Sequence, residues 1–322
     1  MKKTIVIFEH NAGGRLCNQL WNFISIYAYC LEKGYKCRNY SFFEEKKHNF
    51  HECSLANYYD FFNISSLNIL IKLLLFFHLL KNKFFRKLRL YAKYVKLIKI
   101  FYPKQIIYSG NLKPFYLLPS KNQDKKQLQQ LKMIERSKYK KIYLNGWLFR
   151  NPIGIKKFRT DIKEYFKPKN NIIKTVNNFI SPLRNQFKHI VGVHIRQTDY
   201  KTYEKGRYLI QQEEVKEILE DYLKFFNKEN NEVLFIICSD GPINELIFAG
   251  LNIKSGLGKM MEDLFTLSST DIIIGSNSTY GAFAAYYGNI PIAVFKKPTI
   301  DWIKINIKDG YNYNNDCTLT HQ

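Results

Sequence analysis

The chain has 322 residues, of which 46% are hydrophobic and 16% are aromatic. That is enough apolar material for one large or two ordinary domains with their own cores, which excludes global disorder. Lysine and arginine number 50 against 27 acidic residues, giving a formal net charge of +23. A chain this basic is expected to bind phosphate groups of a nucleic acid, an anionic lipid or a phosphorylated small molecule.

Cysteine usage and hydropathy predict a cytoplasmic protein. Six scattered cysteines form no Cys-x-x-Cys pair, so we expect reduced thiols rather than a disulfide framework. The apolar run at residues 4–8 is too short for a cleaved signal peptide. The longest apolar stretch, residues 67–80, contains Lys72 and falls short of the roughly 20 residues of a spanning helix. No transmembrane segment is expected.

The amino-terminal residues predict the opening of an α/β unit. Residues 4–8 form an apolar run typical of a buried parallel strand. The glycine turn Gly13-Gly14-Arg15 follows, and then a helical pattern over residues 18–33 that ends at Gly34.

The middle of the chain has a different character, because no acidic residue occurs within residues 61–123. Over residues 83–100, apolar and basic residues alternate on opposite faces of a predicted helix. We expect a basic amphipathic insertion over about 61–123. Its segment 81–104 is predicted to attach peripherally to the anionic inner face of a membrane. A helix packed on the protein with a solvated basic face is the alternative.

After residue 141 the predicted strands and helices alternate along the chain. This alternation favours a doubly wound parallel sheet. The expected strands are residues 142–144, 190–195, 233–238, 272–274 and 292–295, and the expected helices are residues 158–166, 213–227, 262–269 and 280–287.

Ligands of open parallel sheets bind beyond the carboxyl ends of the strands, and four predicted strand ends carry reactive or polar residues. Arg196 can clamp a phosphate, and Ser278-Thr279 at a helix start can bind an anion. Asp240 can accept two N–H groups from a guanine edge. Together they predict a pocket for a nucleoside diphosphate. The segments are Gly13–Gln19, His194–Tyr200, Ser239–Pro242 and Gly275–Thr279.

Each of these residues also has a purely structural interpretation. Arg196 and Asp199 can form a local ion pair, and Asp240 before Gly-Pro can set a turn. Residues 277–279 can simply cap the following helix.

Metal-dependent chemistry is not indicated by the sequence. No Asp-x-Asp pair occurs, so the usual carboxylates for a metal–diphosphate complex are missing. The spacing of His48, His51 and Cys53 fits no standard zinc pattern. We therefore expect neither a metal nor another cofactor, and the absence of a nucleic-acid-binding motif argues against a nucleic-acid partner.

The motifs at these strand ends resemble those of the α1,2-fucosyltransferase family and, more distantly, the core α1,6- and protein O-fucosyltransferases. Three positions depart from the family pattern: Cys17 for a glycine, Gln197-Thr198 for Arg-Gly, and Gly241 for a second aspartate. The similar segments are Gly14–Gln19, Tyr143–Trp147, His194–Tyr200, Ser239–Pro242, Asp263–Phe265 and Asn277–Tyr280.

The resemblance implies a GT-B-like fold, in which two Rossmann-like doubly wound domains face a cleft. The expected domains are 1–185, on the acceptor side, and 186–322, which binds the GDP-sugar. The implied catalytic residues are Arg196, which holds the β-phosphate, and Asp199. The implied donor-binding residues are Gly14, Arg15, Asn18, His194, Arg196, Asp240, Asp263, Asn277, Ser278 and Thr279.

The function that follows is metal-independent, inverting transfer of fucose from GDP-fucose, α1,2 to galactose, on a glycan or lipid-linked oligosaccharide. The catalytic base stays open among Asp199, Glu9, His10 and Glu204. The alternatives are transfer from another GDP-sugar, or a non-catalytic basic protein that binds membrane or nucleic acid.

Overall fold

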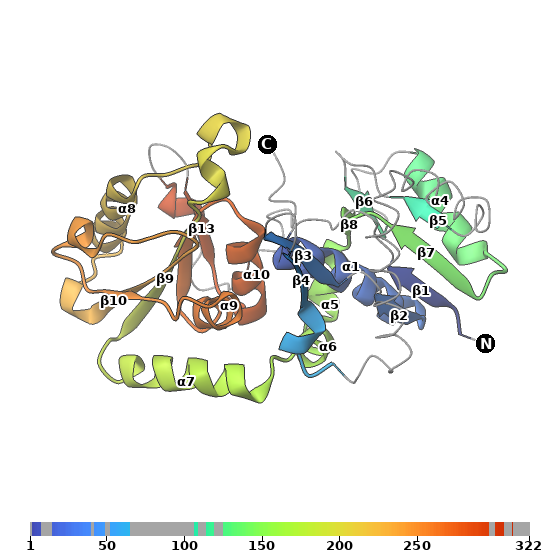
Figure 1. Cartoon of the computed structure of the whole chain (residues 1–322), viewed down its shortest axis with the longest axis horizontal. Helices are drawn as coiled ribbons and strands as arrows, with labels where there is room; N and C mark the ends of the chain where they lie inside the picture. Colours follow the sequence, from blue (N-terminus) through green and yellow to red (C-terminus); the bar gives the residue numbers. More distant parts are fainter. Residues whose placement is uncertain are drawn as a thin grey trace. The chain divides into compact units, whose positions relative to one another are not determined.

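The computed structural model describes residues 2–7, 15–39, 42–48, 52–64, 106–108, 114–118, 125–295, 300–305 and 311. The chain divides into two compact units, Met1–Lys167 and Pro168–Gln322, and each is described by itself (Figure 1). The basic segment 81–104, the turn glycines and the side chains of His48, His51 and Cys53 lie outside the described residues. The hypotheses on them stay predictions.

The first unit is built on a four-stranded sheet in the order β2–β1–β7–β5, in which every pair is parallel. The expected strand–turn–helix opening is confirmed for the strand β1 and the helix α1, which ends where Gly34 adopts a left-handed φ of 65°. The bounds are β1 (Thr4–Ile7), α1 (Leu16–Lys33), β2 (Lys36–Asn39), β5 (Ile106–Tyr108) and β7 (Lys141–Asn145).

Aromatic packing connects α1 to the rest of this unit. The ring of Phe23 meets Phe42 and Phe166 edge-on, with centroids 5.4 and 5.0 Å apart. Such T-shaped pairs are favoured beyond the area they bury. The remaining elements of the unit are β3 (Phe43–His48), β4 (Glu52–Asn57), η1 (Tyr58–Phe61), β6 (Phe115–Tyr116), α4 (Lys125–Arg136), β8 (Phe149–Arg150), α5 (Pro152–Lys157) and α6 (Arg159–Tyr165).

The second unit contains a five-stranded sheet in the order β11–β10–β9–β12–β13, again parallel throughout. Four of its strands are those expected from apolar runs. The chain enters at the central strand β9, builds outward through β10 and β11, and then returns to β12 on the other side. The strand order therefore reverses between β9 and β12. The bounds are β9 (His189–Ile195), β10 (Val233–Ser239), β11 (Ile253–Ser255), β12 (Ile272–Gly275) and β13 (Ile292–Val294).

Helices cover both faces of this sheet, as Figure 1 shows. Val191 and Val193 of β9 belong to the core cluster that α8 covers with Leu219. The residue between them, Gly192, faces the other side, where a Cβ would meet the Leu267 side chain of α9 at 2.8 Å. The bounds are α8 (Gln212–Phe225), α9 (Met260–Leu267) and α10 (Thr279–Gly288), with short 3-10 turns η2 (Asp199–Lys201), η3 (Tyr203–Gly206), η4 (Asn230–Glu232), η5 (Glu245–Phe248) and η6 (Trp302–Lys304).

The boundary between the units falls before α7 (Asn170–Arg184), not between residues 185 and 186 as expected. Arg184 of α7 donates to Asp271 Oδ2 and to the Ser269 carbonyl, each at 2.7 Å. Asp271 Oδ2 also accepts the backbone N–H of Ile190 at 2.7 Å. Helix α7 is thus fixed to the second sheet. The expected boundary assigned this helix to the first domain, whereas it packs with the second.

No helix in the described part of the chain combines the length and the apolar character that crossing a bilayer requires.

Substitution of Gly275 tests whether β9 and β12 need a residue without a Cβ at their closest approach. A Cβ there would lie 2.8 Å from the carbonyl oxygen and 2.9 Å from the Cβ of His194. Gly275→Ala should therefore force the paired strands apart and lower the free energy of unfolding by about 1–3 kcal/mol, measured by urea denaturation.

The matched control is Gly281→Ala in α10, where the nearest atom, His194 Nδ1, is 3.4 Å away. That substitution should be neutral or stabilising, because alanine suits a helix better than glycine. Equal stability of Gly275→Ala and the wild type would contradict this view of the strand contact.

Candidate functional site

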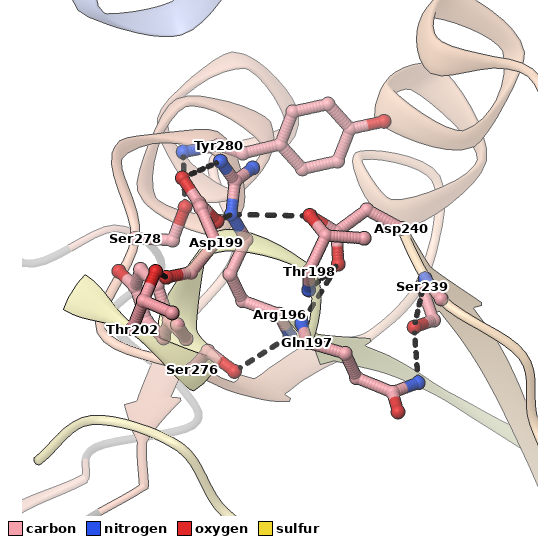
Figure 2. Close-up of polar contacts among 12 residues, drawn as sticks. Arg196, Gln197, Thr198, Asp199, Thr202, Ser239, Asp240, Ser276, Ser278 and Tyr280 are labelled. Carbon is pink, nitrogen blue, oxygen red and sulfur yellow. Dashed lines mark hydrogen bonds and ion pairs between the residues drawn. The ribbon is translucent and has the colours of Figure 1, made fainter. Parts of the chain in front are cut away.

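Arg196 follows the carboxyl end of β9 beside the switch point, and its guanidinium lies between two carboxylates (Figure 2). Its Nε and Nη2 donate to the two oxygens of Asp199, each at 2.7 Å. Asp240 Oδ2 lies 3.3 Å from the same Nε. Burial lowers the pKa of Arg196, but the hydrogen bond and charge of Asp199, and then of Asp240, outweigh it and raise the pKa. The guanidinium stays charged.

One terminal nitrogen of this guanidinium has no hydrogen bond to a described residue. Asp199 occupies the edge formed by Nε and Nη2, whereas Nη1 makes no hydrogen bond to any residue that the structure describes. A guanidinium carries five N–H donors, so the Nη1–Nη2 edge can still bind an oxyanion in a bidentate manner. The predicted local ion pair and the predicted phosphate clamp are therefore compatible.

Asp240 fixes the backbone that follows β9. Its Oδ1 accepts the backbone N–H groups of Gln197 at 2.7 Å and Thr198 at 3.2 Å, and its Oδ2 accepts the Thr198 hydroxyl at 2.6 Å. Burial raises the pKa of Asp240, but these hydrogen bonds and the Arg196 charge together lower it. Both oxygens are thus used within the protein, where the sequence predicted a contact with guanine.

Two departures from the family pattern touch one another in the structure. A Cβ on Gly241 would lie only 3.0 Å from the Cβ of Gln197. Gln197 Nε2 donates to Ser239 Oγ at 2.8 Å and to the Pro242 carbonyl at 2.9 Å. The glutamine therefore occupies the space that a larger residue at position 241 would need, and it ties the loop after β9 to the loop after β10.

The start of α10 follows β12 across the switch point. Ser278 is the N-cap, and its hydroxyl accepts the backbone N–H of Tyr280 at 3.2 Å. Ser276 Oγ accepts the backbone N–H of Arg196 at 2.9 Å, which joins this loop to the Arg196 loop. The structural interpretation of Ser278 as a cap is thus confirmed. The cap uses the Tyr280 N–H, and the positive end of the helix dipole remains at this end of α10.

His194 and Asn277 each have a buried side-chain atom without a hydrogen-bond partner among the described residues. His194 is 4% exposed, and its Nδ1 makes no hydrogen bond within the described residues. The Oδ1 of Asn277 is buried in the same unpartnered state. Buried polar atoms normally have partners, so these two atoms are exceptions among the described residues.

Asp263 is a buried carboxylate that supports a different loop. Its Oδ1 accepts the backbone N–H groups of Leu257 at 2.7 Å and Gly258 at 3.2 Å. Burial raises its pKa, and the hydrogen bonds from Leu257, Gly258 and the Cys238 thiol only partly offset that effect. Asp263 thus shapes the segment between β11 and α9. Across the described residues, no group of three histidine, cysteine, aspartate or glutamate side chains could hold a metal ion.

Hydrogen bonds join the loops that carry most of the predicted residues of the second unit, whereas Asp263 supports the separate loop between β11 and α9. The joined residues are His194, Arg196, Asp199, Asp240, Asn277, Ser278 and Thr279. Arg15 and Asn18 belong to the first unit, where the Arg15 carbonyl accepts the Asn18 backbone N–H at 3.1 Å at the start of α1. Gly14 lies outside the described residues. The donor-binding role of these three residues stays a prediction.

Sequence reasoning missed the contribution of Gln212, the first residue of α8. Its Nε2 donates to the Pro242 carbonyl at 3.0 Å, and its Oε1 accepts the Asn244 backbone N–H at 2.9 Å. A glutamine at a helix start carries no signal that could have placed it against a loop some 30 residues away.

Solved structures share this architecture. A variant of Arabidopsis thaliana FUT1 in complex with GDP has a TM-score of 0.51 at 12% identity, with 95% of this chain and 74% of that chain covered. POFUT1 in complex with GDP gives 0.49 at 15% identity, covering 89% and 94%. The fucosyltransferase NodZ from Bradyrhizobium gives 0.49 at 12%, covering 94% and 97%. At such identities the likeness shows the fold alone, and the expected GT-B-like α/β class is confirmed.

Each unit contains a parallel sheet with helices, and the second unit carries a charged arginine where its central strand ends. These features are typical of the class of GT-B-type glycosyltransferases. The chain belongs to glycosyl transferase family 11, whose model matches residues 115–314, more than half of its length. This confirms the resemblance to the α1,2-fucosyltransferase family. A comparison with curated proteins found no significant match.

The buried His194 should make stability depend on pH. Burial, and then the nearby Arg196 charge, lower the pKa of His194 from 6.5 to about 4. The folded protein therefore holds a neutral imidazole, and stability should fall as the pH drops from 6.5 toward 4, because the unfolded chain binds the proton first. The gap corresponds to about 3 kcal/mol.

The measurement compares unfolding free energies at pH 7.5 and 4.5 for the wild type and His194→Gln, in which this loss should be absent. His189→Gln, at the other end of β9, is the matched control. Burial lowers the pKa of His189 as well, but the side chain is far more exposed, so a smaller change is expected. Parallel pH profiles for the wild type and His194→Gln would rule out this assignment.

Proposed function

We propose that this family 11 glycosyltransferase moves fucose from GDP-fucose to a glycan hydroxyl, α1,2 to galactose, with inversion and without a metal ion. The observation that carries the proposal is the charged Arg196 at the switch point of the second sheet, whose Nη1 makes no hydrogen bond to a described residue. The fold shared with a GDP-bound FUT1 variant supports a GDP-linked donor. We place the enzyme in the cytoplasm, at the membrane through the basic segment 81–104.

In this mechanism Arg196 binds the β-phosphate of the donor. As the bond from the sugar to the phosphate breaks, negative charge grows on the leaving diphosphate. A fixed guanidinium that already faces this position stabilises the charge without reorganising. The amino-terminal end of α10, which begins at Thr279, supplies further positive potential for the phosphates through the helix dipole. These groups take the part that a divalent metal plays in other transferases.

The carboxylates around Arg196 act as positioning residues in this proposal. Both oxygens of Asp199 accept hydrogen bonds from the guanidinium. Both oxygens of Asp240 accept hydrogen bonds from the loop that follows Arg196. His194 and Asn277, which lie on the strand and loop beside Arg196, are the residues proposed to meet the guanosine.

Inversion requires the acceptor hydroxyl to attack the sugar carbon opposite the departing phosphate. Asp199 is poorly suited as the base, because a carboxylate paired with a guanidinium is a weak proton acceptor. Glu204 is an exposed alternative in the same unit, and Glu9 and His10 lie outside the described residues. Gly14, Arg15 and Asn18 are proposed to reach the donor from the first unit.

The direct test of this function incubates the protein with radiolabelled GDP-fucose and lactose, in buffer with EDTA. We expect transfer to proceed unchanged by EDTA, and we expect NMR of the product to show an α1,2 linkage to galactose. A loss of activity that Mn²⁺ or Mg²⁺ restores would contradict the metal-free part. Equal transfer from GDP-mannose would contradict the donor, and RNA or vesicle binding with no response to GDP would favour the non-catalytic alternative.

Arg196→Lys tests the phosphate clamp. Lysine keeps the charge but loses the bidentate geometry, so we expect about 2–4 kcal/mol less transition-state binding, a fall in rate of roughly 30- to 1000-fold. Binding of GDP, measured by calorimetry, should weaken as well. Steady-state kinetics provide the readout.

The matched control is Arg184→Lys, because Arg184 also pairs with a carboxylate at 2.7 Å but lies at the amino ends of the strands. It should lose stability and keep its turnover. Near-normal turnover in Arg196→Lys would remove Arg196 from the mechanism.

A further inference from the structure

Three tyrosines form a cluster beside the Arg196 loop, which we call the tyrosine cluster: Tyr200, Tyr203 and Tyr208. The ring centroids of Tyr200 and Tyr203 are 5.9 Å apart, and those of Tyr203 and Tyr208 are 6.0 Å apart, with both pairs stacked. Tyr200 and Tyr208 close the triangle at 6.1 Å. Tyr203 is 37% exposed, so the cluster offers an aromatic surface to solvent.

The cluster is attached to the phosphate-binding residues at its inner member. The Arg196 guanidinium lies 5.7 Å from the ring centroid of Tyr200. The Tyr200 hydroxyl donates to the backbone carbonyl of Asn277 at 2.5 Å, in the loop after β12. Burial raises the pKa of Tyr200 to about 12, so this hydroxyl remains a donor. The outer member, Tyr208, carries the Arg207 guanidinium 5.7 Å from its ring centroid.

The backbone that arranges these rings is strained. Glu204 and Lys205 are consecutive non-glycine residues with φ of 44° and 60°, in the left-handed region. Each such residue costs about 1–3 kcal/mol, and strain of this kind persists mainly where it serves a function. Here the turn lies between Tyr203 and Tyr208 and brings Tyr208 back onto Tyr203.

We propose that the tyrosine cluster binds the β-galactosyl ring of the acceptor, with Tyr203 as the main contact. A pyranose ring has one face of C–H groups that packs against an aromatic ring, while its hydroxyls reach the polar rim. Arg207 and Glu204 supply that rim. The inference rests on the proposed function and deepens it, since it assigns the acceptor site rather than the donor site.

The position of the cluster favours the acceptor over the guanine base. Arg196 holds the phosphate that leaves, so the acceptor must approach the sugar carbon within reach of that guanidinium. The proposed function already assigns the guanosine to His194 and Asn277. An exposed aromatic surface suits the end of a glycan that arrives from solvent.

The test compares the wild type, Tyr203→Ala and Tyr203→Phe with GDP-fucose and lactose. We expect Tyr203→Ala to raise the KM for lactose at least tenfold. Its KM for GDP-fucose, its donor hydrolysis without acceptor and its Kd for GDP should stay within twofold. Tyr203→Phe, which keeps the ring, should behave like the wild type. Phe225→Ala, an exposed aromatic at the end of α8, is the matched control and should change nothing.

Each other outcome overturns the inference. An unchanged KM for lactose in Tyr203→Ala would show that the ring does not contact the acceptor. A loss of GDP affinity would assign the cluster to the guanine base. If the wild type itself transfers nothing to lactose, the proposed function fails, and that failure is visible before any variant is made. Tyr208→Ala repeats the test if Tyr203→Ala does not fold.

Discussion

The carboxylate of Asp240 is the constraint on which the site depends. The parallel register pairs Ser239 with Ile195, so the residues that follow β10 and β9 emerge side by side. Asp240 then accepts two backbone N–H groups and a hydroxyl from Gln197 and Thr198. These bonds fix the backbone directly after Arg196, whose guanidinium Asp199 holds. Without an acceptor at position 240, the backbone N–H groups of Gln197 and Thr198 would lose this partner.

Much of the second sheet could be predicted because its strands are buried on both faces and read as unbroken apolar runs. The same logic fails where burial is partial. Strand β11 lies at the sheet edge with Lys254 and Ser255 exposed, so no apolar run marks it. Helix α7 carries Pro182, and it belongs to the second unit through Arg184, a contact that only the fold creates. The expected domain boundary was wrong for that reason.

The members of the candidate site were predictable, but their individual tasks were not. Polar residues at strand ends bind ligands and hold loops with the same atoms. Asp240 and Asp263 accept backbone N–H groups, and Ser278 caps a helix, so all three shape the site from within. Arg196 differs from them, because its Nη1 makes no hydrogen bond to a described residue, and it is the residue that we propose for the donor phosphate. The hydrogen bonds in the structure distinguish the residues that hold loops from those that could bind a ligand. The sequence alone does not reveal these hydrogen bonds.

The contact between Gln197 and Gly241 has a consequence for how such an enzyme can change over generations. The space available to a Cβ at position 241 is taken by the glutamine side chain, at 3.0–3.2 Å. A mutant that acquires the second aspartate of the family pattern must therefore move Gln197, and with it the contacts to Ser239 and Pro242. An aspartate at position 241 therefore fits beside Gln197 only if the glutamine side chain shifts by a few tenths of an ångström. Lineages should exchange both positions together, and a residue grafted alone from a relative will carry a penalty that its own chemistry does not explain.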